Sequence, residues 1–285
     1  MKTFWIRTAS AAVYVLLFFG TLLSGWLLKD VKAGMLIFTA FLVFVTVGCT
    51  YEFFRMVGRQ GSTPCKTLGY FLAVAIVLIQ GFLPMLNMVA GFSLMLVLIA
   101  VMPMLFALAA IIQLWGRSEQ PFREAAYSLV PFFYIGWPLS LMLMLIPEVG
   151  TRLLLMVILM VWVNDSAAYI GGSLFGRHKM WQRHSPGKTW EGTAFGVLVT
   201  LLMAFFLGPV IQPGIGRYQW LVLGLICSVV DTLGDLVESM LKRSVDVKDS
   251  GSIMPGHGGF LDRFDSLLII MPFVYAYITL VAYFQ

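Results

Sequence analysis

Residues 192–211 read GTAFGVLVTLLMAFFLGPVI, a run of twenty residues without an ionisable side chain. A helix that crosses the hydrocarbon core of a membrane needs about 20 residues of this kind. Charged residues and clusters of proline and glycine divide the whole chain into nine apolar segments. They are 10–28, 33–51, 68–86, 91–115, 128–146, 152–174, 192–211, 219–241 and 265–284. The sequence therefore predicts an all-α, polytopic integral membrane protein with about nine transmembrane helices.

The composition indicates the same class of protein. Charged residues make up 12% of the chain and hydrophobic residues 60%, with a mean hydropathy of +0.90. A soluble domain carries roughly 25% charged residues, so we expect neither a soluble domain nor a nucleic-acid partner. The first segment is long for a signal peptide, and we interpret it as a retained span. Pro84, Asn87 and Pro103 leave open that the third and fourth segments form one broken hairpin.

Lysine and arginine are distributed unequally between the two sides that nine spans create. Fifteen fall on the side of the N-terminus, whereas only Lys29, Lys32, Arg152 and Arg217 fall on the other. Positively charged loops tend to stay on the cytoplasmic side of a membrane. We therefore expect a protein of the cell (inner) membrane with a cytoplasmic N-terminus and an external C-terminus.

Ionisable residues also divide the chain into two regions. Residues 1–150, with about five spans, carry almost none inside their apolar segments, and Glu52 lies at the end of a span. We interpret this region as an N-terminal transmembrane scaffold. Residues 151–285, with about four spans, carry carboxylates at membrane depth. Such groups are costly there and normally face a polar cavity, so this half is the predicted catalytic region.

The eighth segment and its end carry four charged residues on one helical face. Asp231, Asp235, Glu238 and Lys242 follow one another at intervals of four, three and four residues, which places them in one narrow stripe. A solvated helix end explains Glu238 and Lys242 about as well as a functional role does. It explains Asp231 and Asp235 poorly, because they lie deeper among apolar residues. Their carboxylates call for cations or a buried basic partner.

The loop after this segment ends in Pro255-Gly256-His257-Gly258-Gly259. Proline and glycine there favour irregular backbone with exposed N–H groups, which can approach phosphate oxygens closely. Asp262 and Asp265 follow, three residues apart and hence on one face. They are either helix caps or, together with Asp235, ligands of a hard cation such as Mg²⁺, which prefers oxygen ligands and is often shared with phosphates.

The sixth segment and the loop after it add further polar groups. Asn164 and Asp165 interrupt an apolar run, and a basic loop follows that contains Lys188 within Ser-Pro-Gly-Lys-Thr. A basic cytoplasmic loop can simply fix topology or bind anionic headgroups, but the setting of Lys188 favours a phosphate contact. Carboxylates for a metal and basic residues for phosphates suit phosphoryl or nucleotidyl transfer between a nucleotide and a lipid.

The stretch from Ser239 to Asp265 resembles the signature of phosphatidate cytidylyltransferases, also called CDP-diacylglycerol synthases. The matching elements are Ser239-x-x-Lys242-Arg243, Lys248-Asp249-Ser250-Gly251, Pro255-Gly256-His257-Gly258-Gly259 and Asp262-Arg263-x-Asp265. Leu233-Gly234-Asp235 and Ser185-Pro186-Gly187-Lys188-Thr189 also look like blocks of this family. The resemblance covers roughly residues 160–270, and Asn164 and Ala167 depart from the Ala-Asp-Ser-Gly-Ala-Tyr run of many members. Before residue 150 the chain resembles the family only in its hydrophobicity and in Tyr51-Glu52-Phe53.

This resemblance implies an Mg²⁺-dependent enzyme of phospholipid biosynthesis that converts CTP and phosphatidic acid into CDP-diacylglycerol and pyrophosphate. The implied catalytic residues are Asp235, Lys242, Asp262 and Asp265. The implied substrate-binding residues are Lys188, Ser185, Lys248, Asp249, His257, Gly258, Arg263 and Asp165. The expected metal ligands are Asp235, Asp262, Asp265 and Asp231, with a second cation, monovalent or divalent, beside Mg²⁺. Membrane lipids and a second copy of the chain, in a homodimer, are the expected partners.

Two other functions compete with this interpretation. A CDP-alcohol phosphatidyltransferase carries an Asp-x-x-Asp-Gly-x-x-Ala-Arg core, and this sequence contains no such run. An ion-coupled transporter would also place carboxylates inside the membrane. Transporters often consist of two similar halves, whereas the intramembrane charges here are confined to one half. CTP-dependent release of pyrophosphate by the pure protein would separate these functions.

Overall fold

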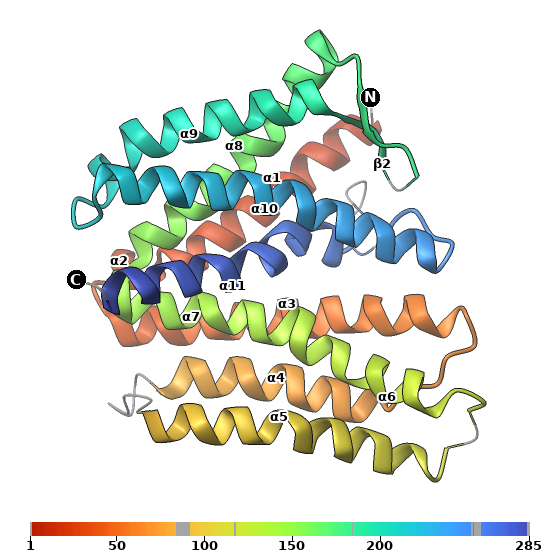
Figure 1. The fold of residues 1–285 in the computed structure, drawn as a ribbon. Helices are drawn as coiled ribbons and strands as arrows, with labels where there is room; N and C mark the ends of the chain where they lie inside the picture. Colours follow the sequence, from red (N-terminus) through yellow and green to blue (C-terminus); the bar gives the residue numbers. More distant parts are fainter. Residues whose placement is uncertain are drawn as a thin grey trace. The chain divides into compact units, whose positions relative to one another are not determined.

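The computed structural model describes residues 2–83, 92–116, 118–183, 185–251, 253 and 258–283, and their side chains except those of 2–9, 92–100 and 283. The chain is almost entirely helical (Figure 1). Its helices are α1 Lys2–Leu22, α2 Ser24–Leu27, α3 Val31–Gly58, α4 Lys66–Phe82, α5 Phe92–Gln113, α6 Pro121–Val130, the π-helix η2 Pro131–Gly136, α7 Trp137–Val149, α8 Thr151–Phe175, α9 Trp190–Ile211, α10 Arg217–Ser244 and α11 Leu261–Tyr283. Two short strands, β1 Lys179–Trp181 and β2 Ser185–Thr189, lie between α8 and α9.

Within the described residues, six helical segments are long and apolar enough to cross a membrane. They are Val31–Gly58, Pro121–Val149, Thr151–Phe175, Trp190–Ile211, Arg217–Ser244 and Leu261–Ala282. Three shorter apolar helices are Ser10–Leu22, Lys66–Phe82 and Val101–Gln113. The prediction of a helical membrane protein is confirmed, and the number of nine spans stays a prediction. Pro84 and Asn87, on which the broken hairpin depends, lie outside the described residues, and Pro103 lies inside α5.

The chain forms two compact units. The first unit contains Met1–Met144 and Asp249–Asp262, and the second contains Leu145–Lys248 and Arg263–Gln285. The division of the sequence at residues 150 and 151 stays a prediction. The segment 249–262, which includes most of the family signature, is part of the first unit.

In the first unit, α3 is the central helix. Asp30 caps its N-terminus, because the carboxylate accepts hydrogen bonds from the backbone N–H of Lys32 at 2.9 Å and of Ala33 at 3.1 Å. Along its length α3 packs against α4 and η2, and α5 packs against α6. The buried side chains of α3 are mostly large and apolar, and Glu52 is a fully buried exception.

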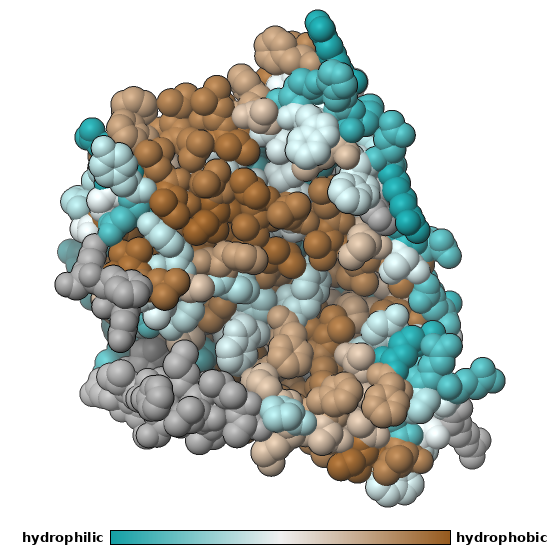
Figure 2. All heavy atoms as spheres, viewed as in Figure 1, coloured by the Kyte–Doolittle hydropathy of each residue, from teal (hydrophilic) through white to brown (hydrophobic). Residues whose placement is uncertain are grey.

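In the second unit, α9 packs against both α8 and α10. Figure 2 shows that apolar side chains cover most of the visible surface of α9 and α10, while hydrophilic ones gather at the end next to the hairpin. The strands β1 and β2 pair antiparallel, with Lys179 opposite Thr189. Thr189 also caps α9, since its hydroxyl accepts the N–H of Gly192 at 3.2 Å. The hairpin therefore leads directly into α9 and fixes the direction in which Lys188 leaves the backbone.

Candidate active site

The charged stripe lies on α10, a helix that runs without interruption through Asp231, Asp235, Glu238 and Lys242. Asp231 and Glu238 are fully buried, whereas the side chain of Asp235 is 33% exposed. A buried carboxylate needs hydrogen bonds, a basic partner or a cation to offset the loss of its hydration. The surroundings of each member of the stripe therefore indicate what it can do.

Three carboxylates of the second unit converge. Asp235 and Glu238 of α10 and Asp265 of α11 each offer an oxygen atom, and these atoms lie within 4.8 Å of one another. Gly234 permits this approach of α10 and α11. A Cβ atom at that position would lie 3.2 Å from the Cβ of Ile269 and 3.3 Å from the Cα of Ser266, closer than most such contacts. We refer to Asp235, Glu238 and Asp265 as the carboxylate cluster.

Two lysines border the carboxylate cluster. Lys188 Nζ lies 2.6 Å from Asp235 Oδ2 and donates a hydrogen bond to the backbone carbonyl of Thr232 at 3.3 Å. Lys242 forms an ion pair with Glu238, one helical turn before it on α10. Lys188 and Lys242 thus each pair with one carboxylate of the cluster, while the three carboxylates stay close to one another. A bound cation would offset the repulsion among them.

Asp231 lies one turn before Asp235 and has different surroundings. Asn164 of α8 donates a hydrogen bond from Nδ2 to Asp231 Oδ2 at 2.6 Å and a longer one to the carbonyl of Ser228 at 3.4 Å. The other oxygen, Oδ1, has no hydrogen-bond partner among the described residues. In the sequence, Asn164 stands out as an interruption of an apolar run and as a departure from the family run, but neither signal predicts its hydrogen bond to Asp231.

Asp165 follows Asn164 on α8, and its side chain is exposed. Its carboxylate lies within electrostatic range of Asp231, Asp235 and Lys188. The structure therefore brings this predicted substrate-binding residue into the same region of the second unit as the carboxylate cluster.

Asp262 belongs to the first unit and binds backbone groups of the loop before α11. Its carboxylate accepts hydrogen bonds from Gly259 N at 2.8 Å and from Ser250 N at 3.1 Å. Such contacts accord with the capping alternative, and the assignment of Asp262 as a metal ligand stays a prediction. Glu238, in the carboxylate cluster, was not among the predicted ligands, although its three-residue spacing from Asp235 placed it on the same face.

The remaining predicted substrate-binding residues are distributed over loops and helix ends. Ser185 is half-buried in β2, and Gly258 is half-buried with a φ of +81°, where a side chain would be strained. The side chains of Lys248, Asp249 and Arg263 are exposed. His257 lies outside the described residues.

A network of hydrogen bonds holds the basic loop to the start of α9. Glu191 accepts hydrogen bonds from the backbone N–H of Arg177 at 3.1 Å and of His178 at 3.1 Å. The ring of His178 also meets Glu191, with Nδ1 2.6 Å from Oε1. These hydrogen bonds link the residues before β1 to the start of α9. They therefore restrain the hairpin that carries Lys188. The strand β2 could not be predicted, because Ser185–Thr189 contains Pro-Gly and no alternation of apolar and polar residues.

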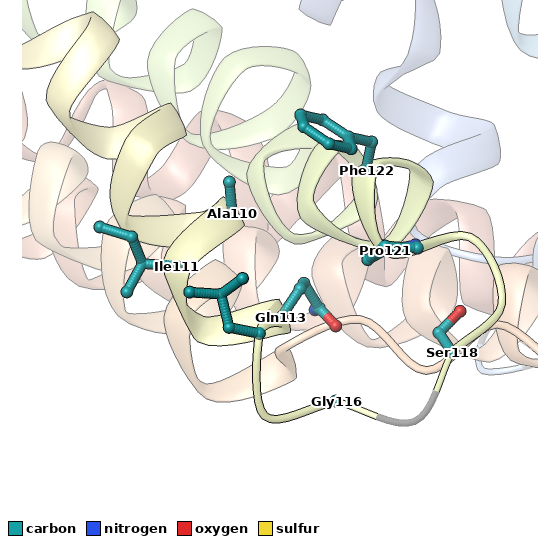
Figure 3. A pocket seen from close by; sticks show the side chains of 8 residues that line it. Ala110, Ile111, Gln113, Gly116, Ser118, Pro121 and Phe122 are labelled. Atoms are coloured by element: carbon teal, nitrogen blue, oxygen red, sulfur yellow. The ribbon is translucent and has the colours of Figure 1, made fainter.

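A cavity of about 430 Å³ lies in the first unit, beside the end of α5 and the start of α6 (Figure 3). Its lining residues are Ala110, Ile111, Gln113, Leu114, Gly116, Ser118, Pro121 and Phe122. None of these is a predicted site residue, and none carries a charged side chain. The described lining residues therefore offer no charged group for phosphate chemistry.

The carboxylate cluster suits a hard divalent cation by the nature of its donors. All three offer oxygen atoms, which Mg²⁺ and Ca²⁺ prefer, and Mg²⁺ commonly uses one or two carboxylates together with water and substrate phosphates. Within the described residues, no cysteine or histidine joins the cluster, so the donor set resembles neither a zinc site nor a copper site.

Comparison with known proteins identifies the family. The sequence model of the cytidylyltransferase family matches residues 5–281. A phosphatidate cytidylyltransferase of Bacillus subtilis is 42% identical over 156 residues, which are 54% of this chain and 58% of that protein. Proteins of the same name from Staphylococcus saprophyticus and Staphylococcus aureus are 33% and 32% identical, and each alignment covers 94% of this chain and 96% of the relative. The chain therefore belongs to the cytidylyltransferase family.

Proposed function

We propose that this chain is a phosphatidate cytidylyltransferase, a nucleotidyltransferase of phospholipid biosynthesis. It transfers the cytidylyl group of CTP to phosphatidate and produces CDP-diacylglycerol and pyrophosphate. The observation that carries this proposal is the carboxylate cluster between Lys188 and Lys242, in a chain of this family with membrane-spanning helices. Anionic nucleotide phosphates and a lipid substrate need both the charged groups and the apolar surroundings.

Asp235, Glu238 and Asp265 are the residues that would hold Mg²⁺. When bound, the ion neutralises charge on the triphosphate and polarises its phosphorus–oxygen bonds. Asp231, Asp262 and a second cation, monovalent or divalent, remain part of the proposal from the family resemblance.

The side chains of the chain itself orient the two substrates. A phosphate oxygen of phosphatidate forms a bond to the α-phosphorus of CTP, the bond from that phosphorus to the bridging oxygen breaks, and pyrophosphate leaves. Lys188 and Lys242 supply positive charge where phosphates must be held, and an ammonium group acts on phosphate as a mobile point charge. Both lysines are held by carboxylates, so that their positive charge is preorganised for the phosphates of CTP.

The lipid substrate determines where this reaction takes place. Apolar side chains of α9 such as Leu198, Leu202 and Phe206 are exposed on the protein surface, as a lipid-facing helix requires. We infer a site at the cytoplasmic face of the cell (inner) membrane, a cytoplasmic N-terminus, an external C-terminus and a homodimer. A reporter fused after Gln285 should behave as external, and a cytoplasmic signal would contradict this topology.

The decisive experiment uses the purified protein in detergent or lipid vesicles. CTP labelled in the α-phosphate and phosphatidate should give labelled CDP-diacylglycerol and one pyrophosphate per lipid product. Removal of divalent cations by EDTA should stop the reaction, and added Mg²⁺ should restore it. Product formation from CDP-diacylglycerol and an alcohol, or ion flux without pyrophosphate release, would instead support one of the competing functions.

A further inference from the structure

Glu52 is a buried carboxylate for which the proposed reaction assigns no role. It lies on α3 in the first unit, and its side chain is fully buried. Three donors surround it. Ser250 Oγ donates to Oε2 at 2.9 Å, Phe260 N donates to Oε1 at 3.0 Å, and Leu261 N donates to Oε2 at 2.9 Å. All three donors come from residues about 200 positions later in the sequence.

The backbone around Glu52 leaves room for its carboxylate and for little else. Gly251 and Gly259 both lie against it, and a Cβ atom at either position would collide with a carboxylate oxygen. Arg55, one turn after Glu52 on α3, donates from Nη2 to the carbonyl of Ser250 at 3.0 Å. Both ends of the segment 250–261 are therefore bound to the same helix.

Packing on the same face of α3 supports this attachment. Phe260 contacts Phe44 edge to face, with ring centroids 5.3 Å apart. The ring of Phe260 also covers Gly48, where an added Cβ atom would lie 2.6 Å from Cδ2 of Phe260. Glu52 lies one turn beyond Gly48, so that an apolar contact and a polar contact hold the same few residues.

The donors around Glu52 suit a carboxylate, because both of its oxygens accept hydrogen bonds. Phe260 N and Leu261 N are backbone donors that cannot accept a hydrogen bond, and each binds a different oxygen of Glu52. An ionised carboxylate is acceptor-only and satisfies both. These two N–H groups lie at the start of α11, where the first helical N–H groups have no partner within the helix and the helix dipole favours negative charge. Glu52 is therefore a capping group supplied by a distant helix.

We propose that Glu52 is a positioning residue that fixes the start of α11 and the signature segment 249–262 on α3. This proposal rests on the proposed function, because its catalytic consequence is the placement of Asp265, which follows Leu261 after one turn of the same helix. Glu52 touches neither substrate nor metal in this role. It stabilises the segment that carries Asp262 and the first residues of the helix that carries Asp265.

The test is a pair of matched substitutions in the first unit. Glu52→Gln keeps the shape of the side chain but replaces one carboxylate oxygen with an NH₂ group, which then faces a backbone or hydroxyl donor. Glu124→Gln is the control, since Glu124 is equally buried and accepts a backbone N–H, that of Thr63, at 2.8 Å. Hydrogen–deuterium exchange of the peptides covering 249–262, thermal unfolding, and the kcat and KM for CTP are measured for both.

Glu52→Gln should accelerate exchange within 249–262 by about tenfold or more, because local opening of this segment becomes easier. The kcat of Glu52→Gln should fall by a similar factor at saturating CTP. Glu124→Gln should lose a comparable amount of thermal stability but change neither the exchange of 249–262 nor kcat.

Ser250→Ala removes one of the three donors and should give a smaller effect in the same direction. This variant tests the proposal if Glu52→Gln does not fold. Unchanged exchange and kcat in these variants would overturn the proposal. A wild-type protein that makes no CDP-diacylglycerol would refute the proposed function, and the exchange data would still decide on Glu52.

Discussion

Glu52 in the first unit and the carboxylate cluster in the second are both acidic sites within a membrane protein, but they differ in what surrounds them. The oxygens of Glu52 accept three hydrogen bonds from N–H and O–H donors. The oxygens of Asp235, Glu238 and Asp265 face one another within 4.8 Å and share two lysines. A carboxylate saturated by donors holds structure together, whereas carboxylates that crowd together remain able to bind a cation.

Burial alone does not separate these two roles. Glu52 and Glu238 are both fully buried, yet one is bound to backbone N–H groups and the other lies beside two further carboxylates. A second carboxylate nearby raises the free energy of an ionised carboxylate, because like charges repel. A backbone N–H donor lowers that free energy. The number and kind of neighbouring donors therefore distinguish a binding carboxylate from a structural one better than its depth does.

The largest expected effect comes from neutralising the carboxylate cluster. Asp235→Asn and Asp265→Asn keep the shape of the side chains but remove one negative charge each. Each should lower kcat/KM for CTP by at least about 100-fold, as the removal of one preorganised electrostatic group commonly does, and should raise the Mg²⁺ concentration required for half-maximal activity. Steady-state kinetics over a range of Mg²⁺ concentrations checks this.

The matched control for these variants is Asp246→Asn. Asp246 is exposed and has a φ of +55°, a backbone conformation that asparagine tolerates well. It should retain normal activity. Near-normal Mg²⁺-dependent synthesis by both Asp235→Asn and Asp265→Asn would remove the carboxylate cluster from the mechanism.

Lys188→Ala should have the next largest effect. It removes the ammonium group that lies 2.6 Å from Asp235 and therefore increases the uncompensated negative charge facing the nucleotide. We expect a rise in KM for CTP of about tenfold or more, since a charge-assisted contact contributes about 1.5–3 kcal/mol. Lys179→Ala, an exposed change in the same hairpin, is the control. Unchanged kinetics for CTP and lipid would leave the loop with a topogenic role only.

Asp231→Asn should have a smaller effect on turnover. This variant tests whether Asp231 is one of the metal ligands. Asp231 is bound by Asn164 and lies outside the three-carboxylate cluster, and an asparagine there can still accept the hydrogen bond from Asn164. A loss of about tenfold is expected, at the low end of the 10- to 100-fold loss that is typical when a residue beside the metal ligands is changed. Losses equal to those of Asp235→Asn, with the same change in Mg²⁺ dependence, would place Asp231 among the metal ligands.

Glu124→Gln should affect stability and leave activity unchanged. Glu124 accepts hydrogen bonds from Thr63 N at 2.8 Å and from Arg123 Nη2 at 3.3 Å. Loss of a charged acceptor should lower the free energy of unfolding by about 1–3 kcal/mol. Thermal unfolding in detergent measures this change, and a fall in turnover without a fall in stability would assign Glu124 a part in the reaction.

Much of the helical framework could be predicted from the sequence, because lipid exposure demands long uninterrupted apolar runs. Residues 152–174 were expected as a span, and α8 covers Thr151–Phe175; 192–211 were expected, and α9 covers Trp190–Ile211. The hairpin of β1 and β2 was not expected, since three- and five-residue strands with Pro-Gly carry no periodic signal.

Residue spacing could group the members of the site only where they share one helix. The spacing of Asp231, Asp235 and Glu238 indicated a common face of α10, and the family resemblance pointed to Asp265. The contact of Glu52 with Phe260 joins residues 208 positions apart, and no periodicity encodes such a pairing. Tyr51-Glu52-Phe53 resembles the family and Glu52 was placed at the end of a span, but neither observation predicts which groups bind its carboxylate.

The membership of residues 249–262 in the first unit has a consequence for biosynthesis. The ribosome finishes Met144 more than a hundred residues before it reaches this segment, an interval of roughly 5 to 20 s at ordinary translation rates. During that time Glu52 is already in the membrane while its three donors have not been made. The nascent first unit must wait for the signature segment before it can close, and a chain that terminates before Asp249 would leave a buried acid for membrane quality control to detect.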